Sequence, residues 1–233
     1  MILTLDDIHT YYGTSHVLFG VSLSLDYGET VCLIGRNGAG KTTTLVSIMG
    51  LTPPRSGSIK FMEEEIVGMP TERIARKGIG FVPEDRGIFA ELTVKENLQI
   101  PASPHDVRWT LDDAYNLFPV LSQKAKCGGG ELSGGEQKML AAARALMLSP
   151  KLLLLDELAE GLSPIMLTVI IEGMRKLKEH RITILLSEQN IKFALALSER
   201  AYVLEKGLIR YQGSVEELSK DQEVSRKYLL ISP

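Results

Sequence analysis

The chain has 233 residues, of which 44% are hydrophobic and 24% are charged, and its formal net charge is −3. This composition is typical of a globular protein with one sizeable core and excludes a largely disordered chain. The small negative charge excludes a broad basic face, so we expect no nucleic-acid partner. No apolar run is long enough to span a bilayer, and the acidic N-terminus lacks the basic start of a secretory signal, so we expect a protein of the cytosol.

The first elements in chain order are two predicted strands, at residues 2–9 and 17–27, which we expect to form an antiparallel flank. Between them lie Tyr11 and Tyr12. Neighbouring residues of an extended backbone point in opposite directions, so only one of the two rings can serve a given site. Such a ring can stack on a purine or fill the edge of a sheet, and the local sequence leaves both possibilities open.

Residues 30–43 predict a buried strand, a glycine-rich turn and the start of a helix that runs to about residue 50. The turn fits the G-x-x-x-x-G-K-[ST] phosphate-loop pattern at every fixed position. Its glycines let backbone amides point at an anion, while Lys41 supplies a positive charge and the Thr42 hydroxyl suits Mg²⁺. An ordinary strand-to-helix turn is the alternative, but a buried strand before the turn is the context that the motif requires. The nucleotide-binding candidates are Gly35, Arg36, Asn37, Gly38, Ala39, Gly40, Lys41, Thr42 and Thr43.

A short strand at 58–61 and a helix at 71–77 are predicted next, and residues 78–82 predict a buried strand that Pro83 closes. Glu84 follows directly. Ligands of open parallel sheets bind at the carboxyl ends of the strands, so Glu84 is a candidate for the site.

Residues 88–147 show no strand pattern and predict an inserted helical subdomain, with helices at 93–99, 108–118 and 133–147. Ser133 and Glu136 have the spacing of a capping box at the start of the last helix. That motif does not account for Gly134 and Gly135, because a glycine inside a helix costs about 1 kcal/mol relative to alanine. We therefore expect something to approach this backbone closely, and a phosphate at the helix N-terminus would fit.

A run of four leucines ends in Asp156 and Glu157, which predicts a fully buried strand with two acids at its carboxyl end. Many strands of α/β proteins end in acids, so this pattern alone is weak. After a phosphate loop, however, an aspartate in this position holds Mg²⁺ beside the threonine hydroxyl. Glu157 would then orient and deprotonate the water that attacks the γ-phosphate.

The remaining chain predicts a helix at 164–180, a buried strand at 182–187 followed by Gln189, and a hairpin of strands 201–205 and 208–212. Alternation of strand and helix from 79 to 186 implies a parallel sheet. Two amphipathic helices are predicted at 214–219 and 221–230. The histidines are dispersed along the sequence, and we interpret them as ordinary surface residues.

Three motifs in this order give the chain a resemblance to the ATP-binding subunits of ABC transporters: the phosphate loop, Leu-Ser-Gly-Gly-Glu-Gln at 132–137, and the acidic strand end. The resemblance covers nearly the whole chain and implies one ABC ATPase domain with a P-loop NTPase fold. Residues 1–87 and 148–233 would form a RecA-like core with the antiparallel flank, and 88–147 the helical subdomain. It further implies that two copies enclose two ATP molecules, each signature facing the partner's phosphate loop. The implied signature residues are Ser133, Gly134, Gly135, Glu136 and Gln137, and the implied adenine-stacking ring is Tyr12.

Within this family the chain is most similar to the cytoplasmic ATPases of branched-chain amino acid importers, which carry Val-Pro-Glu and Glu-Gln-Asn where most relatives have a glutamine and a switch histidine. Here these stand at 82–84 and 188–190. The resemblance implies that Glu84 senses Mg²⁺ and the transmembrane partner, and that Gln189 contacts the γ-phosphate. Since Gln189 cannot carry a proton as imidazole can, base chemistry falls on Glu157. The implied metal-site residues are Thr42, Glu84 and Asp156.

Two positions after the acid pair depart from the family's pattern. Leu158 stands where proline is usual, and Ser163 where aspartate is common. These two departures do not change the candidate catalytic residues.

We therefore expect an ATPase that powers import of branched-chain amino acids or a related small polar nutrient. Its expected partners are transmembrane permease subunits, a second ATP-binding subunit of the same or a related kind, and indirectly a solute-binding protein. Its expected place is the cytoplasmic face of the inner membrane. The alternatives are an ABC-type mechanical ATPase acting on ribosomes or in DNA repair, and a nucleotide-dependent regulator with weak turnover.

Overall fold

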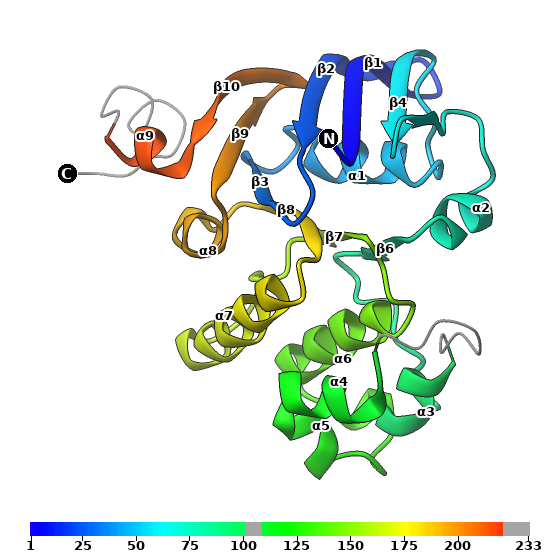
Figure 1. The fold of residues 1–233 in the computed structure, drawn as a ribbon, viewed down its shortest axis with the longest axis vertical. Helices are drawn as coiled ribbons and strands as arrows, with labels where there is room; N and C mark the ends of the chain where they lie inside the picture. The colour runs from blue at the N-terminus through cyan, green and yellow to red at the C-terminus, as the bar shows by residue number, and fades with distance from the viewer. Residues whose placement is uncertain (101–108, 221–233) are drawn as a thin grey trace.

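A six-stranded sheet forms the centre of the computed structural model, which describes residues 1–100 and 109–220 (Figure 1). The strand order is β10-β9-β3-β8-β7-β6, and all neighbours pair in parallel except β10, which is antiparallel to β9. The strands are β3 (Thr30–Ile34), β6 (Ile79–Val82), β7 (Leu152–Asp156), β8 (Thr183–Glu188), β9 (Arg200–Glu205) and β10 (Leu208–Ser214). The predicted parallel α/β core is thus confirmed.

Every residue of β3, β7 and β8 is buried, as expected for parallel strands covered on both faces. Because β3, β6, β7 and β8 run in the same direction, their carboxyl ends share one edge of the sheet. This edge therefore carries the phosphate loop, Glu84, the acid pair 156–157 and Gln189, each of which follows one of these strands.

An antiparallel sheet of order β2-β1-β4-β5 forms the flank at the top of Figure 1. Its strands are β1 (Leu3–Tyr12), β2 (Ser15–Leu25), β4 (Ser56–Phe61) and β5 (Glu64–Glu65). The prediction ended the first strand at residue 9, but pairing continues to Tyr12, opposite Ser15, because Gly13 takes a left-handed conformation that permits a tight turn. Helix α1 (Lys41–Ile48) lies between the two sheets, and their apolar faces share one core with it.

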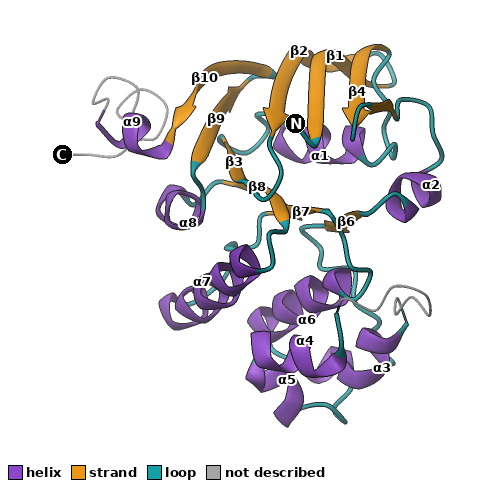
Figure 2. Ribbon diagram, viewed as in Figure 1, coloured by secondary structure: helices purple, strands orange, loops and turns teal. Residues whose placement is uncertain are grey.

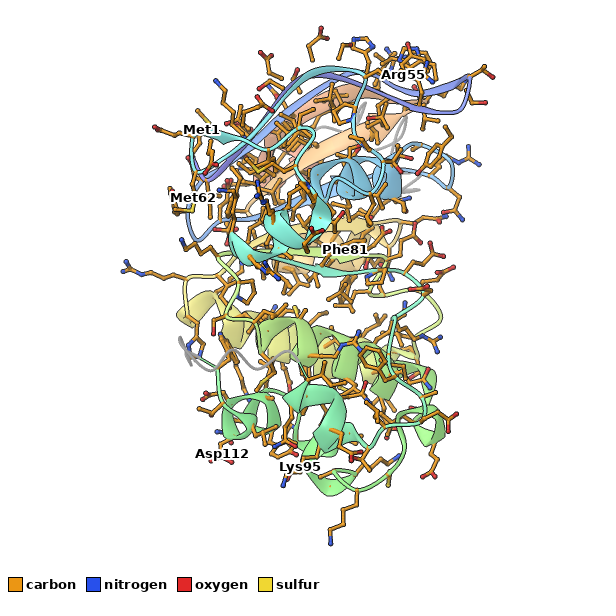
Figure 3. All side chains as sticks on the ribbon, turned by 90° about the vertical axis from the view of Figure 1, so that its right-hand side faces the viewer. Met1, Arg55, Met62, Phe81, Lys95 and Asp112 are labelled. Atoms are coloured by element: carbon orange, nitrogen blue, oxygen red, sulfur yellow. The ribbon has the colours of Figure 1, made fainter. Side chains whose placement is uncertain are left out.

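The segment between β6 and β7 is helical in the described residues (Figure 2). Its elements are α3 (Val94–Gln99), α4 (Leu111–Leu117), α5 (Pro119–Gln123), the 3-10 turn Gly129–Glu131 and α6 (Gly134–Leu146). Helix α5 was not predicted, since the prediction ends the preceding helix at residue 118, whereas Pro119 occupies the first turn of a new helix. In Figure 3 this region, labelled by Lys95 and Asp112, lies opposite the flank labelled by Arg55.

The other helices are α2 (Thr71–Arg76), α7 (Pro164–Glu179), α8 (Ile191–Leu197) and α9 (Val215–Lys220). Helix α8 was missed in the sequence, although Asn190 caps it by accepting a hydrogen bond from the Phe193 amide at 3.1 Å. The helix predicted at 221–230 lies outside the described residues. None of the helices within 1–100 and 109–220 has both the length and the apolarity to cross a membrane.

Candidate active site

The phosphate loop connects β3 to α1 and presents a row of backbone groups at the sheet edge. Gly38 and Gly40 have φ of 77° and 109°, conformations that suit glycine, so the pattern's glycines are required by the backbone. Gly35 is required by space, because a Cβ there would lie 2.5 Å from the Leu204 carbonyl oxygen. Arg36 and Asn37 are exposed, Ala39 and Thr43 are buried, and the exposed Thr42 opens the first turn of α1 beside Lys41.

Lys41 forms a buried ion pair with Glu157, its Nζ lying 3.0 Å from the carboxylate Oε1. The side chains are 3% and 8% exposed, so neither charge is balanced by bulk water. A cavity of about 290 Å³ opens above this pair. It is lined by Asn37, Gly38, Gly40, Thr42, Thr43 and Glu84, together with the ion pair and Val17. A polyanion in this cavity would face the amides of the loop and the positive end of α1.

Asp156 ends β7 inside the protein, 2% exposed. One carboxylate oxygen accepts a hydrogen bond from the Ser187 hydroxyl, whereas Oδ2 is buried without a partner among the described residues. Burial raises the pKa of Asp156, and the hydroxyls of Ser187 and Thr42 oppose that shift. An unpartnered carboxylate oxygen beside a threonine hydroxyl fits a hard cation such as Mg²⁺.

No group of three or more His, Cys, Asp or Glu side chains in the described part of the chain is arranged to hold a metal alone. The oxygens placed to hold Mg²⁺ are those of Thr42 and Asp156, and Mg²⁺ in proteins usually completes its shell with phosphate and water.

Glu84 lies in the exposed loop after β6 and faces other acids. Burial raises the pKa of Glu84, and the negative charges of Glu157, Glu160 and Asp156 raise it further. A wider cleft of about 890 Å³ extends from here and is lined in part by Thr42, Glu84, Asp156, Lys138 and Glu160. The structure therefore brings the predicted metal-site residues to one cleft.

Two residues to which the sequence assigns no role of their own, Glu188 and Lys138, lie buried beside Glu157. Glu188 ends β8, is 1% exposed, and its Oε1 accepts the Ala159 amide at 2.8 Å. Burial raises the pKa of Glu188 to about 7. Lys138, 4% exposed, donates to the carbonyl oxygens of Glu157 and Glu160 at 2.6 and 2.8 Å. A strand end predicts the burial of Glu188, but no sequence pattern signals the bonds of Lys138.

Gln189 is exposed between two anchored neighbours, the buried Glu188 and the helix cap Asn190. These neighbours fix the backbone of Gln189 at the same sheet edge as the phosphate loop, since Ile34 and Glu188 are register partners in β3 and β8.

Tyr12 is 49% exposed at the tip of the β1–β2 hairpin, whereas Tyr11 is packed. The Tyr11 ring stacks on His16 with centroids 4.0 Å apart, and the Arg55 guanidinium covers its other side at 4.4 Å. Only Tyr12 is thus available to a ligand. Although the histidines are dispersed along the sequence, two of them meet in the fold, with His9 Nδ1 and His16 Nε2 3.1 Å apart across the hairpin.

The signature residues begin α6, where the predicted capping box of Ser133 and Glu136 is present. Ser133 and Gly134 lie at the surface, and Gln137 accepts a hydrogen bond from Arg86. A Cβ at Gly135 would lie 2.7 Å from Met166 Cε, the far end of a flexible side chain. The close approach of a ligand to the backbone at Gly134 and Gly135 stays a prediction.

Together the fold and the site define a P-loop ATPase with a helical segment inserted in its parallel sheet. Residues 18–160 match the family model described as "ABC transporter". The chain belongs to the ABC transporter family, as an ATP-binding, ATP-hydrolysing subunit.

Two similar proteins are both ATP-binding proteins of transport systems, but they belong to different systems. The chain is 44% identical over 231 residues to the high-affinity branched-chain amino acid transport ATP-binding protein BraG of Pseudomonas aeruginosa, covering 98% of this chain and 99% of that one. It is 35% identical over 234 residues to the lipopolysaccharide export system ATP-binding protein LptB of Haemophilus influenzae, covering 98% and 97%. Among solved structures, a nucleotide-free ATP-binding cassette from an ABC transporter superposes with a TM-score of 0.83 at 27% identity, covering 100% of this chain and 99% of that one.

Proposed function

We propose that this subunit hydrolyses ATP to drive import of branched-chain amino acids, or a related small polar nutrient, through separate permease subunits at the cytoplasmic face of the membrane. The observation that carries the proposal is the 44% identity to BraG along the whole chain. The motifs at 82–84 and 188–190, which resemble those of branched-chain amino acid importer ATPases, support the same assignment.

The chemistry we propose starts with ATP in the cavity at the phosphate loop. The triphosphate draws Lys41 away from Glu157, because phosphate oxygens compete for the same ammonium group. The freed Glu157 carboxylate accepts a proton from water, whose oxygen attacks the γ-phosphorus as ADP leaves. Thr42 and Asp156 would hold Mg²⁺, with Glu84 nearby, and this ion neutralises charge on the phosphates. Gln189 donates a hydrogen bond to the γ-phosphate.

We further propose that Tyr12 stacks on the adenine and that a second ATP-binding subunit completes the site with residues 133–137. The cavity at the phosphate loop has no residue of 132–137 in its lining. A signature that contacts ATP must therefore contact the ATP of another subunit.

The permease subunits would dock where the wide cleft meets the apolar surface between the sheet and the helical segment. Leu51 and Leu148 are 56% and 45% exposed there, although both are apolar. The pockets that they line share Phe81, which lies at the middle of the molecule in Figure 3. Exposed apolar side chains grouped beside a cleft favour a protein interface. The solute-binding protein would act on the permeases and not on this chain.

Purification of the tagged chain from detergent-solubilised native membranes tests the proposal. We expect permease subunits to be recovered, and deletion of the gene to abolish uptake of labelled leucine, isoleucine or valine. The relation to LptB makes export the second candidate. Recovery of lipopolysaccharide export components with unchanged amino acid uptake would establish that candidate. Recovery of ribosomal or DNA-repair proteins instead would overturn transport altogether.

A further inference from the structure

The loop 157–160 carries the proposed catalytic base, and its backbone is held from several directions. Glu157 has φ of 47°, a left-handed conformation that side chains other than glycine adopt only when their surroundings impose it. Its amide donates to the Ser187 carbonyl oxygen at 2.9 Å, and the Ala159 amide donates to Glu188. These two bonds come from β8 and fix the amide side of the loop.

The Lys138 side chain bonds to the carbonyl side of the same loop, where the Glu157 carbonyl oxygen also accepts the Glu160 amide at 3.3 Å. Its ammonium group donates to the carbonyl oxygens of Glu157 and Glu160, and the side chain is 4% exposed. Burying a cation costs several kcal/mol unless hydrogen bonds compensate. Burial lowers the pKa of Lys138, against the attraction of Glu188 and Glu160. An apolar side chain would fill this space without the cost of burying a charge. Packing alone therefore does not explain why a lysine that bonds to two carbonyl oxygens of the loop stands here.

Lys138 belongs to α6, the helix whose first turn is the signature. It follows Ser133 by little more than one helical turn, and no break in α6 separates them. A displacement of the signature turn therefore moves the Lys138 ammonium, and with it the carbonyls that set the position of Glu157. Lys138 thus connects the surface proposed to meet the partner's ATP with the base that acts on the chain's own ATP.

We propose that Lys138 is a positioning residue, which holds the Glu157 backbone in its catalytic conformation and makes that conformation depend on the signature helix. The proposal rests on the role given to Glu157 in the proposed function.

The test compares Lys138→Met, Lys138→Gln and the wild-type full chain. Methionine fills the same space without hydrogen-bond donors, so we expect kcat to fall by about 10- to 100-fold while the Kd for ATP changes by less than about twofold. Glutamine keeps N–H donors without the charge and is expected to recover part of kcat. Lys176→Met controls for the loss of a lysine bond to a backbone carbonyl at an exposed site, because Lys176 donates to the Asn116 carbonyl oxygen at 3.0 Å and is far from the loop in sequence.

A double-mutant cycle that combines Lys138→Met with Glu157→Gln distinguishes a role in positioning Glu157 from a general role in packing. If Lys138 acts through Glu157, Lys138→Met lowers residual turnover by less than about twofold in the Glu157→Gln background. The proposal would be overturned if Lys138→Met lowered turnover by the same factor in the Glu157→Gln background as in the wild type. It would also be overturned if Lys138→Met alone had the kcat of the wild type. An equal fall in ATP affinity and kcat would also overturn it. If Lys138→Met fails to fold, Lys138→Gln decides by the same criteria. Normal turnover of Glu157→Gln itself would remove the base assigned in the proposed function, and this inference with it.

Discussion

The ion pair between Lys41 and Glu157 joins the lysine of the phosphate loop to the carboxylate proposed as the general base. Both side chains are nearly buried, so solvent does not screen the pair. Removing either charge would leave the other buried without compensation. Phosphate oxygens offer Lys41 a stronger negative charge than one carboxylate does. If Glu157 is the base, the pair would make its release depend on ATP binding.

Glu157→Gln tests this role directly, since glutamine has nearly the same size but cannot accept a proton. We expect turnover to fall at least about 100-fold, as is usual for the loss of a general base. Binding of ATP should persist, because the substitution also frees Lys41 from its partner. Phosphate release gives kcat and a fluorescent nucleotide gives Kd. Glu72→Gln, at an exposed position of α2, is the control, and turnover near that of the control would contradict the role.

Glu188 makes stability depend on pH, because its pKa is raised from 4.5 to about 7 by burial. The folded state then binds this proton more tightly than the unfolded state. Its stabilising contribution is complete below about pH 4.5 and is lost as the pH rises through about 7. Glu188→Gln removes that dependence.

We therefore expect the free energy of unfolding of Glu188→Gln, relative to wild type, to rise by about 3 kcal/mol between pH 5 and pH 8. Urea unfolding at the two pH values measures it, with Glu72→Gln as an exposed carboxylate control. A constant difference between variant and wild type across this range would mean that Glu188 titrates normally.

At the scale of elements, the β9–β10 hairpin supports the phosphate loop through its turn. The Gly207 amide donates to the Ala39 carbonyl oxygen at 2.8 Å, and the Gly207 carbonyl accepts the Phe19 amide at 2.9 Å. The turn is thus bonded to the phosphate loop on one side and to β2 on the other. Gly207 has φ of 75°, and a Cβ there would lie 1.9 Å from the Val17 carbonyl oxygen.

Gly207→Ala should therefore cost about 3 kcal/mol of stability, from strain and overlap together, and should weaken ATP binding by displacing the loop. Gly68→Ala is the matched control, since Gly68 has φ of 79° and a methyl group added there would have no atom within 4 Å. It should cost about 1 kcal/mol, from strain alone, and leave Kd unchanged. Thermal unfolding and nucleotide titration distinguish the two. Equal effects of both substitutions would contradict the supporting role of the hairpin.

The sequence predicts the elements that depend on local signals. Buried strands such as β3 and β7 are continuous apolar runs, and the start of α6 carries its own capping box. Helices α5 and α8 were missed because they are short and begin at Pro119 and after Asn190, residues that also end elements. Their formation is decided by packing against the rest of the protein and less by their own sequence.

The same distinction holds within the candidate site. Residues of the phosphate loop and the strand ends are predictable, because one backbone motif and one sheet edge bring them together. Three contacts of the site could not be predicted: the bonds of Lys138 to the loop 157–160, the pairing of Lys41 with Glu157, and the packing of Gly135 against Met166. Each joins segments far apart in sequence, and lysine or glycine at such positions has no distinguishing local pattern.

At the scale of the whole molecule, the signature residues 133–137 lie outside the lining of the cavity at the phosphate loop. The cavity at the phosphate loop is lined by the loop, Glu84, Glu157 and Val17, whereas Ser133 is exposed at the start of α6 and is absent from that lining. If Ser133 contacts ATP directly, the proposed function assigns it to the ATP of a second subunit. A substitution there should consequently separate nucleotide binding from turnover.

Ser133→Arg makes that separation measurable. The arginine is expected to block approach of a second subunit's phosphates, so hydrolysis should be lost while each chain still binds ATP at its own loop. The substitution also removes a helix cap, which costs about 1 kcal/mol. Thr110→Arg controls for this cost, because Thr110 caps α4 with the same capping-box geometry and is also exposed. Loss of turnover in Ser133→Arg, with both variants equally destabilised and both binding ATP, would support a site shared between two subunits. Loss of ATP-dependent dimer formation in Ser133→Arg but not in Thr110→Arg would distinguish a shared site from displacement of Lys138 within one chain. Equal turnover of the two variants would instead leave hydrolysis to a single chain.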